Sequence, residues 1–209
     1  TIFHLMGQHV NYKLRYRKEQ AKFWASSYEE KRPELTTAQR KMLSHYDNAT
    51  LYNDSIVAQI VKRFQKEDAV VIYVPDHGEE CYEEDRGFIC RNHSANIDWP
   101  LAHYEFEIPF WIYCSPKYIR NHRDIYRQIR KAKDKRFMTD ALPHLLLYLA
   151  GIETPTYKEE YNILSPKYNE MRPRILKNSA DYDQLRDEHL EKVEKEKSKK
   201  EKSKKGDKK

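Results

Sequence analysis

One short segment constrains the fold of this chain more than any other. Residues 69–74 read AVVIYV, an apolar run rich in β-branched side chains, which is typical of a strand buried on both faces. Pro75 follows at once, and because proline has no N–H to donate to a central ladder, we expect the strand to end there. Residues 76–79 (DHGE) then lie on the loop at the carboxyl end of that strand, where open α/β sheets place their ligands.

Strand and helix patterns alternate around this segment. The predicted elements are, in order, a strand over residues 1–5, a capped helix from 36 to 64, the strand over 69–74, an irregular loop over 79–104, a strand over 107–114, and helices over 122–133 and 139–149. Gly151 is in place for the C′ cap of the last helix. This order predicts an α/β fold in which helices flank a mostly parallel sheet.

The charge of the chain is concentrated at its carboxyl end. The 209 residues include 39 Lys and Arg against 33 Asp and Glu, a net charge of +6. Residues 184–209 supply +4 of this, so residues 1–183 form a nearly neutral domain that has little field to attract nucleic acid. Without an apolar face, residues 184–209 are predicted to be a disordered tail or a fraying solvated helix. Attraction of this tail to anionic lipid is the alternative.

The composition also argues against two further classes, membrane-spanning proteins and disulfide-rich proteins. No apolar run approaches the roughly 20 residues that span a bilayer, so no transmembrane helix is predicted within these residues. Three cysteines are too few for a disulfide scaffold and lack the spacing of a metal site. Cys81 and Cys90 are close enough in sequence to pair in an exported protein, and their pairing is left open.

Four residues are candidates for a site. Asp76 and His77 offer the oxygen and nitrogen donors that Zn²⁺ accepts, and adjacent residues on a turn can aim both at one point. The alternative is a capping aspartate beside an ordinary loop histidine. His9 and His93 can donate to a phosphoryl or sulfuryl oxygen or serve as second-metal ligands; the alternative is two exposed loop histidines.

Three ordered motifs resemble those of the phosphoethanolamine transferases, which belong to the sulfatase and alkaline-phosphatase-like superfamily. Residues 4–9 (HLMGQH), 46–54 (YDNATLYND) and 73–79 (YVPDHGE) are similar to the family forms HxMGSH, YDNxxLYxD and YVSDHGE. Residues 108–111 and 145–152 also look like the closing strand and helix of that family. The resemblance covers about residues 1–165.

The resemblance implies roles for the candidate residues. Asp76 and His77 would be two ligands of the catalytic zinc, and His9 and His93 would surround the substrate phosphate. The implied reaction is a two-step transfer, through a phosphorylated Thr, from phosphatidylethanolamine to lipid A or another cell-surface glycan. The implied location is the bacterial inner membrane, reached through an N-terminal segment that these residues lack, with the catalytic domain facing the periplasm.

The chain also departs from the family pattern. The family's Thr nucleophile precedes the first motif, and Thr36, Thr37 and Thr50 do not match it. We therefore expect the carboxyl-terminal half of a catalytic domain, with no catalytic nucleophile and no activity in isolation. Two alternatives stay open: a sulfuric-ester or phosphodiester hydrolase of the same superfamily, which the Asp-His pair disfavours, and a non-catalytic degenerate module.

Overall fold

The structure is a computed structural model that describes residues 1–83, 86–87, 89–92 and 96–206. The chain divides into two compact units, each assembled from separate segments. The first unit comprises Thr1–Ile72, Glu79–Arg91 and Tyr113–Tyr118. The second comprises Tyr73–Gly78, Asn92–Ile112 and Ile119–Lys209.

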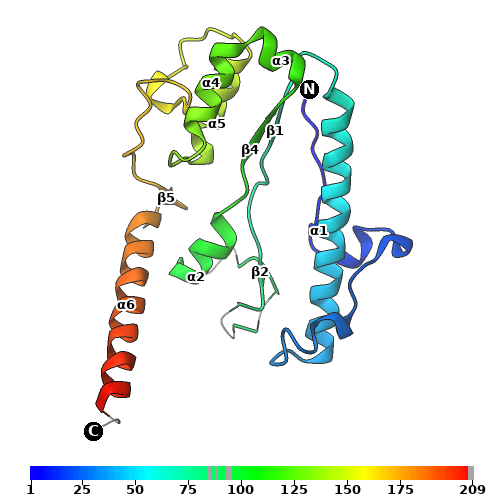
Figure 1. The fold of residues 1–209 in the computed structure, drawn as a ribbon, viewed down its shortest axis with the longest axis vertical. Coiled ribbons are helices and arrows are strands. Elements are labelled where there is room, and N and C mark those ends of the chain that lie inside the picture. Colours follow the sequence, from blue (N-terminus) through cyan, green and yellow to red (C-terminus); the bar gives the residue numbers. More distant parts are fainter. Residues whose placement is uncertain (84–85, 88, 93–95, 207–209) are drawn as a thin grey trace. The chain divides into compact units, whose positions relative to one another are not determined.

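Helices predominate over strands in the described part of the chain (Figure 1). The α-helices are α1 (Thr37–Phe64), α2 (Trp99–Leu101), α3 (Pro116–Asn121), α4 (Arg123–Ala132), α5 (Leu142–Leu149) and α6 (Tyr182–Gly206). Short 3-10 helices are η1 (Tyr12–Leu14), η2 (Lys18–Gln20), η3 (Ala25–Tyr28), η6 (Thr139–Ala141) and η7 (Glu159–Tyr161), and η5 (Ala102–Phe106) is a π-helical turn. The strands are β1 (Val70–Tyr73), β2 (Glu80–Cys81), β3 (Ile89–Cys90), β4 (Trp111–Cys114), β5 (Ile175–Leu176) and β6 (Ala180–Asp181).

Helix α1 organises the first unit and begins where the sequence predicts. The Thr36 side chain accepts a hydrogen bond from the Gln39 N–H, and the Gln39 side chain accepts one from the Thr36 N–H, so the capping box is complete. The core against this helix consists of Tyr28, Leu35, Leu43, Cys81 and Tyr82. The predicted helix over 36–64 is therefore confirmed.

A buried amide ties the irregular segment before α1 to the helix. Asn48, on α1, is 3% exposed. Its Oδ1 accepts hydrogen bonds from the N–H groups of Lys22 (2.7 Å) and Phe23 (3.1 Å), and its Nδ2 donates to the Phe23 carbonyl at 2.8 Å. Because every polar atom of this buried amide has a backbone partner, the 22–23 backbone is fixed against the helix without regular secondary structure of its own.

The sheets are smaller than the sequence analysis predicts. Within the described residues there are three two-stranded sheets, β1 with β4, β2 with β3, and β5 with β6. The last two are antiparallel, with Cys81 opposite Ile89 and Leu176 opposite Ala180. The 69–74 and 107–114 strands are therefore found in shortened form, and within the described residues they pair only with each other, so the mostly parallel sheet stays a prediction.

The expected strand over residues 1–5 is wrong. These residues form no regular secondary structure, and Ile2 is 92% exposed. Phe3 instead packs edge-on against Phe64 at the end of α1, with the ring centroids 6.1 Å apart. An apolar segment of this length is compatible with a strand or with a chain that packs on a helix, and periodicity alone does not separate the two.

The second unit confirms the two helices predicted near the carboxyl end. Helix α4 corresponds to the basic segment 122–133, and η6 followed by α5 corresponds to 139–149. Gly151 has a φ of +64°, the left-handed conformation expected of a C′ cap. A small apolar cluster of Ala102, Leu176 and Tyr182 connects η5, β5 and α6.

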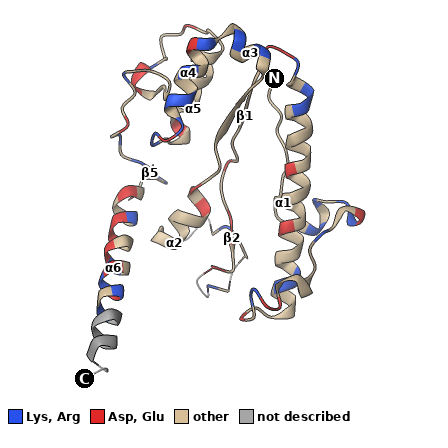
Figure 2. Ribbon diagram, in the orientation of Figure 1, with Lys and Arg blue, Asp and Glu red and all other residues tan. Residues whose placement is uncertain are grey.

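Helix α6 carries most of the tail. It extends from Tyr182 to Gly206, and Lys and Arg alternate with Asp and Glu along it (Figure 2). The segment expected to be disordered or a fraying helix is therefore helical as far as it is described, and a separate domain over 184–209 stays a prediction. Of the helices that the structure describes, none combines the length and apolar character needed to cross a membrane.

The three cysteines all lie among the described residues and are free thiols. Cys81 and Cys114 are buried, and burial raises the pKa of both thiols. Cys81 lies opposite Ile89, not Cys90, in the β2–β3 ladder. The structure therefore contains no Cys81–Cys90 disulfide.

Candidate functional site

The candidate metal ligands follow β1 directly. Strand β1 ends at Tyr73, whose ring stacks on Trp111 of β4 with centroids 5.2 Å apart and an interplanar angle of 18°. Pro75 ends the strand as predicted, and Asp76 and His77 follow it on the loop. The Asp76 side chain is 88% exposed, whereas His77 is 22% exposed.

The His77 ring is oriented by the backbone. Its Nδ1 lies 2.7 Å from the carbonyl oxygen of Gly78. Because a carbonyl oxygen only accepts, Nδ1 carries a proton in this contact. A ring N–H donated to a backbone carbonyl is the usual outer contact of a metal-binding histidine, since it fixes both the tautomer and the ring orientation.

The other ring nitrogen of His77, Nε2, lies near the carboxylate of Asp76. The distance from His77 Nε2 to Asp76 Oδ1 is 3.7 Å. Two ligands of a tetrahedral Zn²⁺, each at its usual bond length, lie about 3.3 Å apart. The two donor atoms thus have nearly the separation of a ligand pair, and the donor set fits zinc.

Within the described residues, Asp76 and His77 form a pair only. No group of three or more His, Cys, Asp or Glu side chains suited to a metal ion occurs in that part of the chain. A structural zinc site has four protein ligands and a catalytic one has three. The pair alone is therefore too small to form a zinc centre, and a complete centre would need further ligands; the assignment of Asp76 and His77 as ligands stays a prediction.

Two hydrogen bonds to Glu105, on η5, hold the loop that carries His77 and the segment at Asn92. The Gly78 N–H donates to the Glu105 carbonyl at 2.8 Å, and the Asn92 N–H donates to Glu105 Oε1 at 2.6 Å. Glu105 is buried, so both hydrogen bonds are shielded from water. One residue thus joins the loop of His77 to the residue that precedes His93. π-Helical turns such as η5 are often found at functional sites.

Gly78 is required because another backbone segment passes close to it. A Cβ at this position would lie 2.2 Å from the carbonyl oxygen of Tyr104. Only glycine allows the two backbone segments to approach so closely.

Of the other two predicted residues, one lies in the first unit and the other lies outside the described residues. His9 belongs to the first unit, where it is exposed and its Nδ1 lies 3.4 Å from the Val10 carbonyl. Arg15 holds this turn through hydrogen bonds to the carbonyls of His9 (3.1 Å) and Val10 (3.2 Å). His93 lies outside the described residues. The convergence of both histidines on Asp76 and His77 stays a prediction.

The sequence analysis missed Tyr12, which lies three residues after the first motif and contacts the last residue of the third. Tyr12 is fully buried and donates its hydroxyl to Glu79, the last residue of the YVPDHGE motif. Burial, and next the hydrogen bond to Glu79, raise the pKa of Tyr12 well above its ordinary value. The Tyr12 ring packs edge-on against Tyr46 at 5.2 Å, so this side chain contacts residues of the second and third motifs. A tyrosine three residues after His9 was the available signal.

A second missed contact lies beside it. Glu80 is fully buried, and its carboxylate accepts a bidentate pair of hydrogen bonds from Arg86, at 2.6 and 3.0 Å. A fully buried carboxylate is stable only when it is paired in this way. Two adjacent glutamates followed by an arginine were visible in the sequence but have no specific pattern.

Comparison with known proteins defines the class to which this fold and this site belong. The sequence profile of the sulfatase family matches residues 1–152. Because that match spans well over half of the chain, the protein belongs to the sulfatase family.

Within that class, the chain is similar to phosphoethanolamine transferases. Phosphoethanolamine transferase EptC of Escherichia coli O18:K1:H7 is 33% identical over 192 residues, which cover 88% of this chain and 32% of EptC. Kdo(2)-lipid A phosphoethanolamine 7''-transferase of Escherichia coli K12 is 30% identical over 138 residues, or 65% of this chain and 23% of the relative. The chain thus spans a third or less of the length of these relatives.

A solved structure agrees with the sequence matches. The C-terminal periplasmic domain of EptC from Escherichia coli, in complex with Zn, superposes with a TM-score of 0.68 at 28% identity, covering 86% of this chain and 50% of that domain. The chain is therefore a homologue of the periplasmic domain of EptC-type phosphoethanolamine transferases. The resemblance stated from the three motifs is confirmed.

Proposed function

We propose that the complete protein transfers phosphoethanolamine from phosphatidylethanolamine to lipid A or another cell-surface glycan, at a zinc centre to which this chain contributes Asp76 and His77. The observation that carries the proposal is the local geometry of that pair, in which Nε2 of an oriented imidazole faces a carboxylate oxygen at 3.7 Å. The names of the relatives support the reaction, and the Zn in the EptC structure supports the metal.

The chain's own residues have separate tasks in this proposal. Asp76 and His77 hold the metal, and the Gly78 carbonyl keeps the His77 ring in its ligand tautomer. Zinc, when bound, supplies Lewis-acid stabilisation of negative charge on phosphoryl oxygens. His9 and His93 donate hydrogen bonds to those oxygens or protonate the leaving group. The hydrogen bond from the Asn92 N–H to Glu105 supports the place given to His93.

The reaction exchanges one phosphorus–oxygen bond for another. The bond from phosphorus to the diacylglycerol oxygen breaks, a bond to the acceptor oxygen forms, and the acceptor proton ends on diacylglycerol. We propose that a threonine elsewhere in the complete protein carries the group between the two steps, because Thr36, Thr37 and Thr50 do not match the family's nucleophile.

The same proposal extends to location and fold. We place the complete protein in the bacterial inner membrane, with this part of it in the periplasm, in agreement with the similarity to a periplasmic domain. In the complete domain, β1 and β4 would belong to a larger, mostly parallel sheet whose carboxyl edge carries Asp76 and His77.

The test is transfer by the complete protein in membrane vesicles that contain phosphatidylethanolamine and lipid A. Release of diacylglycerol and mass labelling of lipid A are followed in the wild type, in Asp76→Ala and in His77→Ala. We expect both variants to lose at least about a hundredfold in rate, as removal of a metal-coordinating or charge-stabilising group typically does.

The matched controls are Asp134→Ala and His122→Ala, which remove the same chemical groups at positions outside the three motifs. Both should keep the wild-type rate. Undiminished transfer by His77→Ala would contradict the ligand assignment. Hydrolysis of a sulfate ester without transfer of phosphoethanolamine would contradict the reaction.

A further inference from the structure

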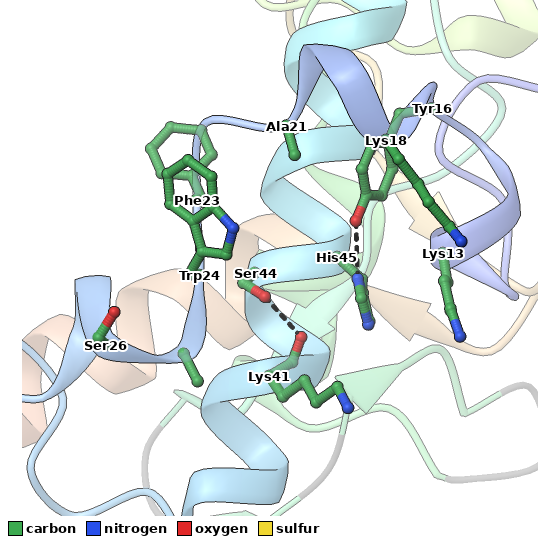
Figure 3. A pocket seen from close by; sticks show the side chains of 11 residues that line it. Lys13, Tyr16, Lys18, Ala21, Phe23, Trp24, Ser26, Lys41, Ser44 and His45 are labelled. Carbon is green, nitrogen blue, oxygen red and sulfur yellow. Dashed lines mark hydrogen bonds between the residues drawn. The ribbon is translucent and has the colours of Figure 1, made fainter.

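The first unit contains a cavity of about 490 Å³ that the proposed reaction does not use. It lies between the irregular segment that carries η1, η2 and η3 and the first turns of α1. The side chains that line it are Lys13, Tyr16, Lys18, Ala21, Phe23, Trp24, Ala25, Ser26, Lys41, Ser44 and His45 (Figure 3). None of these residues is a candidate metal ligand or phosphate-binding histidine.

Three ammonium groups surround this cavity without a counter-charge. Lys13, Lys18 and Lys41 all line it, and none forms an ion pair with a carboxylate in the described part of the chain. The local sequence is also basic, since residues 10–26 include five Lys and Arg and a single Glu. Unpaired cations around a concave surface raise the local concentration of anions.

The opposite end of the cavity is aromatic. Phe23 and Trp24 lie together there (Figure 3), and Trp24 is 58% exposed although it is a large apolar side chain. Asn48 fixes the backbone at Phe23 through hydrogen bonds of 3.1 and 2.8 Å. The aromatic surface is therefore pre-organised, which lowers the entropy lost when a ligand stacks on it.

Between the cations and the aromatic rings lies a neutral polar pair. The Tyr16 hydroxyl is 2.9 Å from His45 Nδ1 (Figure 3). Burial, and next the charges of Lys13 and Lys41, lower the pKa of His45, so its ring is neutral near pH 7. This pair adds hydrogen-bonding capacity to the cavity without adding charge.

We propose that this cavity binds a phosphorylated saccharide, with the phosphate among Lys13, Lys18 and Lys41 and the sugar ring against Trp24. Cations select the phosphate, the exposed indole matches the apolar face of a sugar ring, and neighbouring hydroxyl groups match its polar edge. The choice of a saccharide over other phosphate-bearing ligands rests on the proposed function, in which the acceptor is a glycan.

The test is binding of glucose 1-phosphate to the full chain, measured by calorimetry and by the fluorescence of Trp24. We expect glucose 1-phosphate to bind at least about tenfold more tightly than inorganic phosphate or glucose, because both ends of the cavity contribute. Trp24→Phe should remove most of the fluorescence change, although two other tryptophans, Trp99 and Trp111, remain.

Charge-matched double variants distinguish binding in the cavity from general attraction of the phosphate to a basic surface. Lys13→Gln with Lys41→Gln should weaken binding by about tenfold or more, whereas Lys62→Gln with Lys66→Gln, exposed on the same unit but outside the cavity, should change it less than twofold. Equal weakening by both pairs would overturn the proposal. So would inorganic phosphate or adenosine monophosphate binding as tightly as glucose 1-phosphate.

The outcome is independent of the transfer reaction. Binding requires neither zinc nor turnover, so Asp76→Ala and His77→Ala should bind glucose 1-phosphate as the wild type does. Loss of transfer with unchanged binding in these two variants is the result that both proposals expect. Absence of glucose 1-phosphate binding in an active protein would contradict only the saccharide site, and undiminished transfer by His77→Ala would contradict only the zinc ligand assignment.

Discussion

Two regions of the molecule hold carboxylates in different ways. In the first unit, Glu79 and Asp47 accept hydrogen bonds from the hydroxyl groups of Tyr12 and Tyr28, two buried and uncharged donors. In the second unit, Asp183 at the start of α6 is held by positive charge. The first arrangement is a pairing of a neutral donor with an anion in the core, and the second is an ion-pair network.

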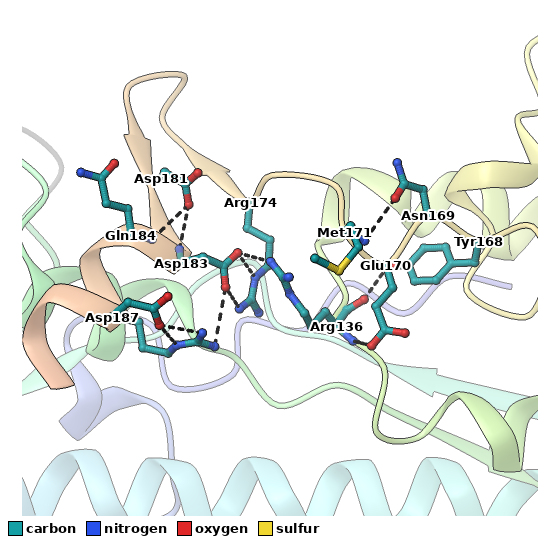
Figure 4. A network of polar contacts seen from close by, with 11 residues as sticks. Arg136, Tyr168, Asn169, Glu170, Met171, Arg174, Asp181, Asp183, Gln184 and Asp187 are labelled. Carbon is teal, nitrogen blue, oxygen red and sulfur yellow. Dashed lines mark hydrogen bonds and ion pairs between the residues drawn. The ribbon is translucent and has the colours of Figure 1, made fainter. Parts of the chain in front are cut away.

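The network around Asp183 is drawn in Figure 4. Arg174 donates to both oxygens of Asp183, at 2.5 and 3.1 Å, and Arg136 and Arg186 also pair with it. The Asp183 side chain is 19% exposed, so solvent and salt reach part of the network. The two units should therefore lose stability under opposite conditions. Tyrosine hydroxyls lose their proton in alkali, whereas carboxylates lose their charge in acid.

The largest loss of stability is expected at Gly78, which takes part in neither kind of side-chain pairing. Gly78→Ala places a Cβ 2.2 Å from the Tyr104 carbonyl oxygen, and because both groups are backbone-bound the clash should lower the free energy of unfolding by about 3 kcal/mol. Chemical denaturation measures it. Gly151→Ala is the control, since it meets open space and costs only about 1 kcal/mol for its positive φ. An equal cost at both positions would contradict the close approach.

Tyr12→Phe tests the neutral pairing of the first unit. The variant removes the hydroxyl that donates to Glu79 and should lower the free energy of unfolding by about 2 kcal/mol, because the carboxylate loses a buried donor. Tyr52→Phe, also on a half-buried ring of the same unit, should cost less than about 0.5 kcal/mol. The interpretation fails if the two variants are equally stable.

Asp183→Asn tests the charged network of the second unit. Partial exposure screens the ion pairs, so we expect a loss of about 1 kcal/mol in low salt that shrinks in high salt. Asp187→Asn, whose carboxylate is more exposed and pairs with Arg186, should lie within about 0.5 kcal/mol of the wild type. A loss for Asp183→Asn that is independent of salt would argue against a charge-based network.

The pH dependence of stability should separate the two regions. The raised pKa values of Tyr12 and Tyr28 mean that their stabilising effect is complete below about pH 10, the unfolded value, and is lost above it. The Arg174 guanidinium lowers the pKa of Asp183, so the effect of that group is present above about pH 4 and is lost as pH falls below it. Tyr12→Phe should reduce the alkaline loss alone, and Asp183→Asn the acid loss alone. If either variant changed the acid and the alkaline loss of stability equally, the two regions would not differ in their pH dependence.

Much of the fold was predictable because it depends on local signals. The capping box of Thr36 and Gln39 marks the start of α1, and Gly151 marks the end of α5. The strand that precedes Asp76 and His77 was evident from its β-branched run and its closing proline. The strand predicted over residues 1–5 failed because a short apolar segment does not specify its partner, which is Phe64 of α1.

The surroundings of the candidate site were not predictable in the same way. The contacts of Glu105 with Gly78 and Asn92 involve backbone groups, whose partners leave no pattern in the amino-acid sequence. The role of Gly78 depends equally on the distant Tyr104 carbonyl. Motifs thus identified the residues that bear the chemistry, and only the structure revealed what holds them in place.

The central claim is that Asp76 and His77 bind zinc, and the zinc content of the complete protein tests it most directly. Purified wild type, Asp76→Ala, His77→Ala and the controls Asp134→Ala and His122→Ala are dialysed against trace zinc and measured by elemental mass spectrometry. We predict stoichiometric zinc in the wild type and both controls and its loss from Asp76→Ala and His77→Ala. Undiminished zinc in a folded His77→Ala variant would contradict the account.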